Sequence, residues 1–285
     1  MSATRVMAQR FPRVVGSARR VRAGWRQVGD QGRFYGQTLG SVVDVVVHYR
    51  AEFLRQVAVM SLGTGALAII GGTVAVVSFL NMSTGAIIAA QVYPQFSQVG
   101  VEALTGFGSA FLVTRLISLG TAVIAFAATL GAGATAQLGA MRINEEIDAL
   151  EVMGVRSVAY LASTRVLAGT IVVVPLYCIA LLMAYFAARF GTTALYGQSV
   201  GVYDHYFRTF LVPGDVFRSF ATVLVLAVVI MLVHTYYGYT ATGGPAGVGR
   251  AVGRATRTSL VAAGFVILFV TLALYGQTGN FNFSG

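Results

Sequence analysis

The sequence predicts an all-α integral membrane protein, with an interfacial helix near the N-terminus, five transmembrane helices and one short cytoplasmic helix between the second and the third. Two observations predict this class. Of the 285 residues, 56% are hydrophobic and only 11% are charged, whereas about 25% of the residues of soluble domains are charged. Five charge-free stretches are also longer than the roughly 20 residues that cross a bilayer.

The N-terminal arm, residues 1–50, is expected to lie on the membrane surface. Residues 1–56 hold ten arginines and three acids, and anionic lipid headgroups explain this charge better than nucleic acid does, because half of all arginines lie in this one segment. Its apolar residues, Trp25 and Phe34 among them, suit a helix that lies in the interface; a disordered tail is the alternative. No cleavable signal peptide is expected, since the first apolar run begins more than fifty residues into the chain.

Residues 51–285 are expected to form one membrane domain. Its crossings are expected at about 57–80, 113–136, 162–188, 217–240 and 258–277. The polar segment 81–100 after the first run contains a proline and leaves room for a re-entrant piece. Cytoplasmic flanks retain arginine, and sixteen of the twenty arginines lie on the cytoplasmic side if the N-terminus is inside and the C-terminus outside. This orientation is therefore expected, in the plasma (inner) membrane.

Several functions are excluded by the residues that the chain lacks. It contains no lysine, so it can neither carry a Walker A site nor form a Schiff base. Any ATP-driven work must therefore come from another polypeptide. No HExxH, CxxC or GxSxG motif occurs and the three histidines are far apart in sequence, so no catalytic residue, metal site or cofactor is expected in this chain.

His234 is the one ionisable group deep in an expected crossing, the fourth. Ionisable groups inside membranes are functional candidates, which makes His234 a candidate intramembrane polar site. A neutral histidine that is bonded to a neighbouring helix is an equally good interpretation.

The second crossing carries a row of small residues. Ala127, Gly131, Thr135 and Gly139 recur every four residues, with Gly133 beside them. One face of this helix is therefore almost without side chains, and another helix can approach it closely. Gly131, Gly133, Thr135 and Gly139 are accordingly expected to serve helix packing.

An acidic helix follows this row. Four of the ten acids of the chain lie within seven residues, namely Glu145, Glu146, Asp148 and Glu151. At about 100° per residue, Ile143, Ile147 and Leu150 form an apolar stripe, and three of the acids face the opposite side. Gly154 is expected to end the helix. A solvated loop is the simplest interpretation, but acids gain nothing from a negatively charged leaflet, so a basic groove on a soluble partner is favoured.

Two segments of the chain resemble the MlaE/YrbE permease family of ABC transporters. Residues 136–154 read AQLGAMRINEEIDALEVMG, close to the family pattern AELGxMxxxEQIDALxxMG, and residues 238–261 resemble the stretch before its last helix. The resemblance extends over about 50–276. The chain differs from many members at Thr129, Gln137 and Arg115, and this favours the B-type YrbE subunit of an actinobacterial Mce lipid-import system, in which two different permeases pair.

The resemblance implies a specific assembly. It comprises a second permease, a dimer of cytosolic ABC ATPases that bind ATP and Mg²⁺, MCE-domain proteins and a lipid substrate held in a cavity between the permeases. The acidic helix would be the coupling helix that docks on the ATPases. Its contact residues would be Glu145, Glu146, Asp148, Leu150 and Glu151. Gly139 and Gly154 would shape the helix ends.

Two other classes of function serve as alternatives. A secondary transporter or channel driven by an ion gradient needs paired buried charges or broken helices in matching halves, and the crossings offer only His234 and no visible repeat. A membrane enzyme that acts on lipids needs a convergent set of catalytic groups, and the sequence shows none.

Overall fold

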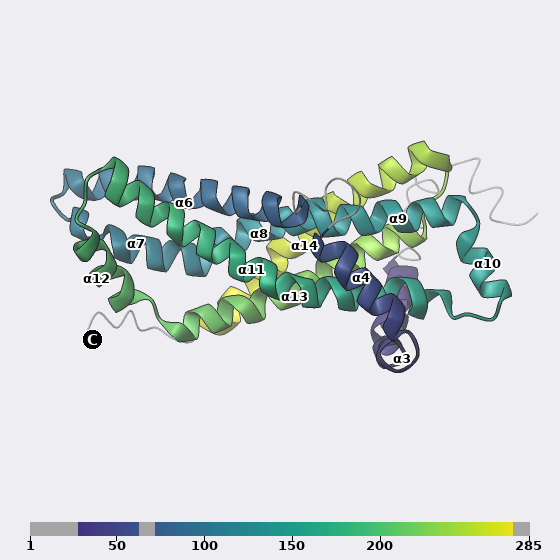
Figure 1. The fold of residues 1–285 in the computed structure, drawn as a ribbon. Helices are drawn as coiled ribbons and strands as arrows, with labels where there is room; N and C mark the ends of the chain where they lie inside the picture. The colour runs from purple at the N-terminus through teal and green to yellow at the C-terminus, as the bar shows by residue number, and fades with distance from the viewer. Residues whose placement is uncertain (1–27, 63–71, 276–285) are drawn as a thin grey trace, which may run out of the picture.

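The computed structural model describes residues 28–62 and 72–275, and this part of the chain is helical with no strand. A helix over 28–40 precedes the labelled helices (Figure 1). These are α3 (Val42–His48), α4 (Arg50–Leu62), α6 (Gly72–Gln98), α7 (Thr105–Leu112), α8 (Ser118–Phe126), α9 (Ala132–Ile143), α10 (Glu146–Val152), α11 (Thr164–Phe190), α12 (Val200–Phe210), α13 (Pro213–Tyr239) and α14 (Gly244–Tyr275).

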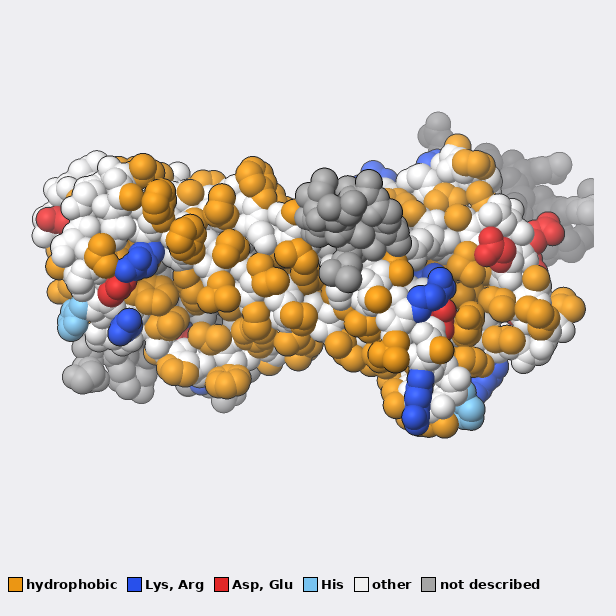
Figure 2. Space-filling model, in the orientation of Figure 1, with side chains coloured by type: hydrophobic (Ala, Val, Ile, Leu, Met, Phe, Trp, Pro, Cys, Tyr) orange, Lys and Arg blue, Asp and Glu red, His pale blue; other side chains and the backbone are white. Residues whose placement is uncertain are grey.

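Five helical spans in the described residues are long and apolar enough to cross a membrane, which confirms the predicted fold class. They are Gly72–Gln98, Glu102–Ile143, Val158–Leu195, Pro213–Tyr239 and Gly244–Ala273. The second span is continuous through α7, α8 and α9, joined by π-helical turns at Val113–Ile117 and Ala127–Gly131. Charged side chains lie toward the two ends of the bundle, and its visible middle is apolar (Figure 2), as expected of a body that spans hydrocarbon.

The first crossing differs from the expectation. It was expected at 57–80, whereas the first long apolar helix is α6, which continues through the polar segment as far as Gln98 with Pro94 inside it. Residues 63–71 lie outside the described part of the chain. The polar segment is helical because its polar groups are bonded locally: Asn81 Nδ2 donates to the Val77 carbonyl at 3.0 Å, and Thr84 donates to the Leu80 carbonyl at 2.9 Å. No re-entrant piece is present between 72 and 98.

The bundle is held together by close helix pairs at small residues. α6 packs along α11 at Gly85, whose position leaves no room for a Cβ against the Ala184 backbone. α9 packs on α13 and α14, where a Cβ at Gly131 would lie 2.6 Å from the His234 ring. Because lipid gives helices no hydrophobic reason to associate, this close van der Waals packing supplies much of the attraction between them.

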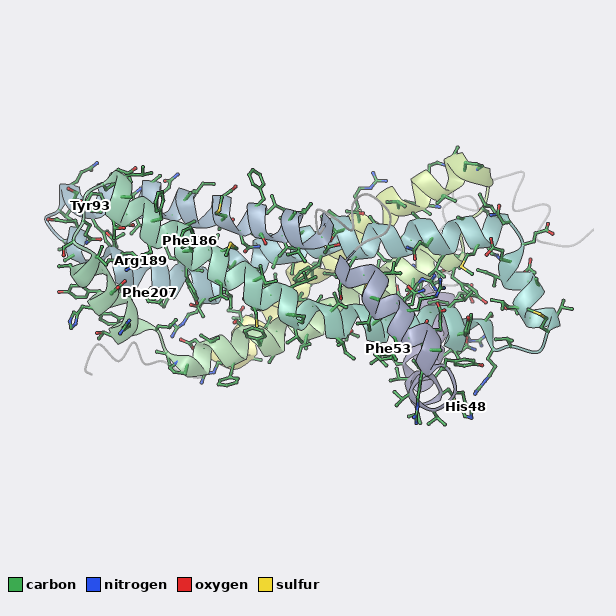
Figure 3. The ribbon with its side chains drawn as sticks, in the orientation of Figure 1. His48, Phe53, Tyr93, Phe186, Arg189 and Phe207 are labelled. Atoms are coloured by element: carbon green, nitrogen blue, oxygen red, sulfur yellow. The ribbon has the colours of Figure 1, made fainter. Side chains whose placement is uncertain are left out.

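The two ends of the bundle are built differently. α10 projects from one end, and α12 covers the opposite end (Figure 1). Arg189 of α11 forms two hydrogen bonds with Asp204 of α12, at 2.8 and 3.0 Å, and Phe207 of α12 packs edge-on against Tyr185 at 5.1 Å. Figure 3 shows Arg189 and Phe207 together at this end. α12 is thereby fastened to α11.

The N-terminal helices lie against the side of the bundle near α10 (Figure 1). Phe34 and Val45 face the bundle and are buried, whereas Val43 is 71% exposed. The expected interfacial arm is described only from residue 28, so Trp25 and the arginines before it lie outside the described residues.

Candidate functional site

The acidic helix leaves the bundle through a sharp corner. α9 ends at Ile143, and Glu145 has a φ of 60°, a left-handed conformation that is uncommon for residues with a side chain. α10 then runs over Glu146–Val152. It ends in a paired hydrogen-bond pattern: Val155 N–H donates to the Leu150 carbonyl and Gly154 N–H to the Glu151 carbonyl, each at 3.0 Å. Gly154 has a φ of +78°, as a helix-ending glycine in this motif requires.

The apolar side of α10 attaches it to the bundle. Ile147 is fully buried and packs with Leu138 of α9 and Leu161. Leu150 is only partly buried at the edge of the same cluster. Burying a side chain such as Ile147 contributes about 1.5–3 kcal/mol, so α10 is a fixed projection of the bundle.

The four acids of this region divide into two pairs. Asp148 forms an ion pair with Arg142 of α9 at 2.6 Å. Glu151 accepts hydrogen bonds from Ser157 Oγ at 2.6 Å and from the Tyr239 hydroxyl at 3.0 Å, and these bonds hold the pKa of its carboxyl below the ordinary value. Asp148 and Glu151 are therefore bonded to residues of the bundle although both stay exposed, whereas the other two acids are not.

Glu145 and Glu146 face outward. Within the described part of the chain neither is in an ion pair, and Glu146 has only a long contact with Asn144, at 3.4 Å. Two apolar residues next to them are strongly exposed: Val152 by 89% and Met153 by 68%. These four residues, which we call the α10 outer face, can contact another protein without breaking an internal bond.

The sequence interpretation did not include Val152 and Met153. Helical periodicity alone predicts that Val152 is exposed, because it lies five residues after Ile147 and therefore about 140° around the helix from that buried residue. Leu150, which was expected to contact a partner, belongs to the stripe itself.

The small residues of the second span serve different purposes. Gly131, Thr135 and Gly139 lie at contacts with α13 and α14; a Cβ at Gly139 would lie 2.8 Å from Val248. Gly133, which was expected to pack against a helix, has nothing within 4 Å of where its Cβ would be. It faces a cavity of about 340 Å³ beside Thr129 and other residues of α4, α6 and α9.

His234 joins three helices. It is fully buried, its Nδ1 lies 2.8 Å from Thr135 Oγ1 of α9, and its Nε2 lies 3.1 Å from Ser259 Oγ of α14. Both ring nitrogens thus have a hydroxyl partner, which a neutral imidazole satisfies with one donor and one acceptor. This geometry fits the packing interpretation of His234.

Comparison with known proteins identifies the family. Residues 62–273 match the family described as Permease MlaE. The chain belongs to the MlaE permease family. The matched region contains every span from α6 to α14 and the acidic helix between the second and third spans.

Relatives of this permease are found in bacteria and plastids. It is 26% identical over 69% of its length to a probable ABC transporter permease protein of Synechocystis, 74% of which is covered. A probable ABC transporter permease protein of Rickettsia felis is 27% identical over 85% of this chain and 92% of its own length. The chloroplastic protein TRIGALACTOSYLDIACYLGLYCEROL 1 of Arabidopsis is 29% identical over 66% of this chain and 53% of its own length. The chain is thus a multi-pass membrane subunit of the ABC permease type rather than an enzyme.

Replacing His234 by leucine tests its packing role. Thr135 and Ser259 each retain a backbone carbonyl partner, at 3.0 and 3.0 Å, so neither hydroxyl is left without a bond. We expect the permease to lose about 1–2 kcal/mol of stability, since interhelical hydrogen bonds in membranes average about 0.6 kcal/mol, and to keep its transport rate per folded molecule. Thermal unfolding in detergent measures the first quantity and a reconstituted transport assay the second. Folded protein without transport would show that His234 has a chemical role.

Proposed function

We propose that this permease is one of two permease subunits of an ATP-driven, Mce-type lipid importer, and that it couples a lipid cavity to cytosolic ATPases through α10. The observation that carries the proposal is the α10 outer face: two acids that form no ion pair with any described residue, and two exposed apolar side chains, on a helix anchored by Ile147. The absence of lysine supports it, because the nucleotide site must then be on another chain.

The topology that fits this function puts α10 and the N-terminus in the cytoplasm and the C-terminus outside, in the inner membrane. α3 and α4 lie near the α10 end of the bundle (Figure 1). Arg142, Arg156 and Arg250 lie near the α10 ends of their spans, which suits a cytoplasmic side.

The partner expected at α10 is a basic groove on an ABC ATPase dimer, which binds ATP and Mg²⁺ itself. Exposed acids next to apolar side chains suit such a groove, because charge gives orientation and the apolar contact gives affinity. Glu145, Glu146, Val152 and Met153 would make the contact, whereas Asp148 and Glu151 hold α10 in place.

The lipid cavity is expected along α6 and α14. These two spans are the least buried of the five, with 28% and 17% of their most apolar windows buried inside the chain. α14 exposes a stripe of large apolar residues, namely Val261, Phe265, Leu268, Phe269 and Leu272. A second YrbE-type permease that faces this stripe would enclose an apolar volume suited to lipid chains, with MCE-domain proteins at the outer end.

Charge reversal at the outward acids tests the docking surface. In the Glu145→Arg, Glu146→Arg variant, like charges would face the basic groove at a cost of several kcal/mol, so we expect co-purification of the ATPase to fall at least about tenfold. Membrane insertion should be unchanged, because neither acid is in an ion pair within the described residues. Quantitative pull-down from detergent-solubilised membranes measures the effect.

The matched control is Glu102→Arg at the opposite end of the bundle, which should retain the ATPase. Asp148→Arg is not a clean test, because it would place two arginines side by side at Arg142. Full co-purification by the double variant would contradict docking at α10.

A further inference from the structure

A cluster of three hydrogen-bonding side chains joins three separate elements at the base of α10. Glu151 is the next-to-last residue of α10, Ser157 directly precedes the turn Val158–Ser163 that leads into α11, and Tyr239 is the last residue of α13. Ser157 Oγ lies 2.6 Å and the Tyr239 hydroxyl 3.0 Å from the same oxygen, Glu151 Oε1, and the two hydroxyls are 2.8 Å apart. We call these residues the Glu151 cluster.

The hydrogen bonds of the Glu151 cluster are charge-assisted, because two hydroxyl groups donate to an ionised carboxylate. Two hydroxyl protons are available, and an ionised carboxylate only accepts, so both hydroxyls can donate to Glu151. The hydrogen bonds from Ser157 and Tyr239 lower the pKa of Glu151, which keeps it ionised at neutral pH. Hydrogen bonds to an ionised acceptor are about twice as strong as neutral ones.

The segment that the cluster fixes has open space beside it. Residues 154–159, between α10 and α11, line a hollow of about 620 Å³. Glu151 and two residues of the helix over 28–40, Gln37 and Gly40, also line it. Little packing restrains the segment on that side. Elsewhere the segment is held by the ion pair of Arg156 with Asp44 of α3 at 2.9 Å and by the buried Ala159. The hydrogen bonds of Glu151, with the contact between Ser157 and Tyr239, link it to the end of α13.

From Tyr239 the contacts continue into the membrane part. The Tyr239 ring packs against Phe34 at 5.3 Å, and Arg142, which pairs with Asp148, lies over the same ring at 5.9 Å. One and a half turns earlier on α13, His234 is bonded to α9 and α14. A displacement of α10 that keeps the cluster intact must therefore move the end of α13 as well.

We propose that Glu151 is a positioning residue that transmits movement of α10 to α13 and α11, rather than a docking residue for the ATPase. This inference rests on the proposed function, because it assigns the coupling step to a particular contact. It divides the acidic helix between two tasks: Glu145 and Glu146 bind the partner, and Glu151 passes the motion on. Without the cluster, α10 would still be held by the packing of Ile147 and by the Asp148–Arg142 ion pair, but its direct hydrogen bond to the end of α13 would be lost.

The test uses the complete transporter in vesicles of total lipid extract from the source membrane. The variants are Glu151→Leu, Tyr239→Phe and Glu151→Gln, and three quantities are measured: bound ATPase, ATP hydrolysis per complex, and lipid moved per ATP, counted by mass spectrometry. We expect ATPase binding and hydrolysis within about twofold of the unaltered complex. Lipid moved per ATP should fall at least about tenfold in Glu151→Leu, because the variant loses two charge-assisted hydrogen bonds and the loss of either one corresponds to about that factor.

The conservative variants separate positioning from folding. Tyr239→Phe should also lower the ratio of lipid to ATP, because it removes one donor and keeps the ring against Phe34. Glu151→Gln keeps an acceptor oxygen and should retain most of the coupling. An unchanged ratio in Glu151→Leu would overturn the inference, and so would loss of bound ATPase in that variant, which would make Glu151 a docking residue.

If the proposed docking of the ATPase at α10 is wrong, the variants give a different set of results from those that contradict the role of Glu151. In that case the Glu145→Arg, Glu146→Arg variant keeps its ATPase, whatever the Glu151 variants do. If that variant loses its ATPase while Glu151→Leu keeps both ATPase and coupling, only the inference about Glu151 fails.

Discussion

Replacing Gly85 by alanine will separate α6 from α11 and destabilise the permease by about 3 kcal/mol, at the upper end of the usual cost of overpacking. A Cβ at this position would overlap the Ala184 carbonyl oxygen and lie 2.9 Å from its carbonyl carbon. Both obstacles are backbone atoms, so no side chain can rotate away and a whole helix must shift. Thermal unfolding in detergent will show the loss as a lower midpoint.

The chain offers a matched control in Gly120 of α8. The same substitution there meets nothing within 4 Å, and alanine is favoured over glycine inside a helix by about 1 kcal/mol. Gly120→Ala should therefore be as stable as the unaltered chain or slightly more stable. If Gly85→Ala unfolds at the same temperature as Gly120→Ala, that result would contradict the close approach of α6 to α11 at Gly85.

Removing the carboxylate of Glu52 will have the second large effect. Glu52 of α4 is 7% exposed and accepts two hydrogen bonds from Arg55 and one from Gln56, at 2.7–2.8 Å. Arg165 of α11, 3% exposed, acts on the same carboxylate electrostatically. Arg55 is 65% exposed and can turn to solvent. Arg165 forms no ion pair within the described residues, but the nearby charge of Glu52 offsets part of the cost of its burial. Losing this attraction and the hydrogen bonds that the Glu52 carboxylate accepts should cost about 1.5–3 kcal/mol.

A double variant separates this cause from a general packing defect. Glu52→Gln alone should lower stability by about 2 kcal/mol. Adding Arg165→Met removes the buried positive charge and nearly conserves the volume, so the double variant should recover about 1 kcal/mol of that loss. Thermal unfolding of the unaltered chain, both single variants and the double variant gives a double-mutant cycle, which measures the interaction between the two side chains. Additive losses would show that the two side chains do not interact.

The carboxylate of Glu52 also predicts how the stability of the permease depends on pH. Burial raises the pKa of Glu52, but the hydrogen bonds from Arg55 and Gln56 and the two nearby guanidinium groups outweigh it, so the pKa lies below its ordinary value of 4.5. A lowered pKa in the folded state stabilises the fold fully above the unfolded value, and the contribution is lost as the pH falls through the folded value. The stability difference between the unaltered chain and Glu52→Gln should therefore be constant above pH 4.5 and shrink below it. A difference that grows as the pH falls would contradict this sign.

The sequence alone determined the membrane class, the number of apolar spans and the acidic helix with its end at Gly154. Hydrophobic length, charge-free stretches and helical periodicity are local properties, and they can be read along one segment. The first span was misplaced for a related reason. The stretch between Arg55 and Glu102 carries no charge, so hydropathy alone favoured its most apolar part, while Asn81 and Thr84 are accommodated in α6 by bonds to the helix backbone.

Only the tertiary structure decided what the individual polar residues do. Periodicity placed Glu151 among the exposed acids, and it is exposed, but the hydroxyl of Tyr239, 88 residues later, donates a hydrogen bond to it. Glu52 follows directly after the expected interfacial arm, and in the structure it is buried on α4, where the charge of Arg165 from α11 acts on its carboxylate. His234 was open to two interpretations from the sequence, and its contacts with Thr135 and Ser259 fit the packing interpretation. The physical reason is the same in each case: a polar side chain in an apolar setting takes its role from its bonding partner, and helix packing brings that partner from a distant part of the chain.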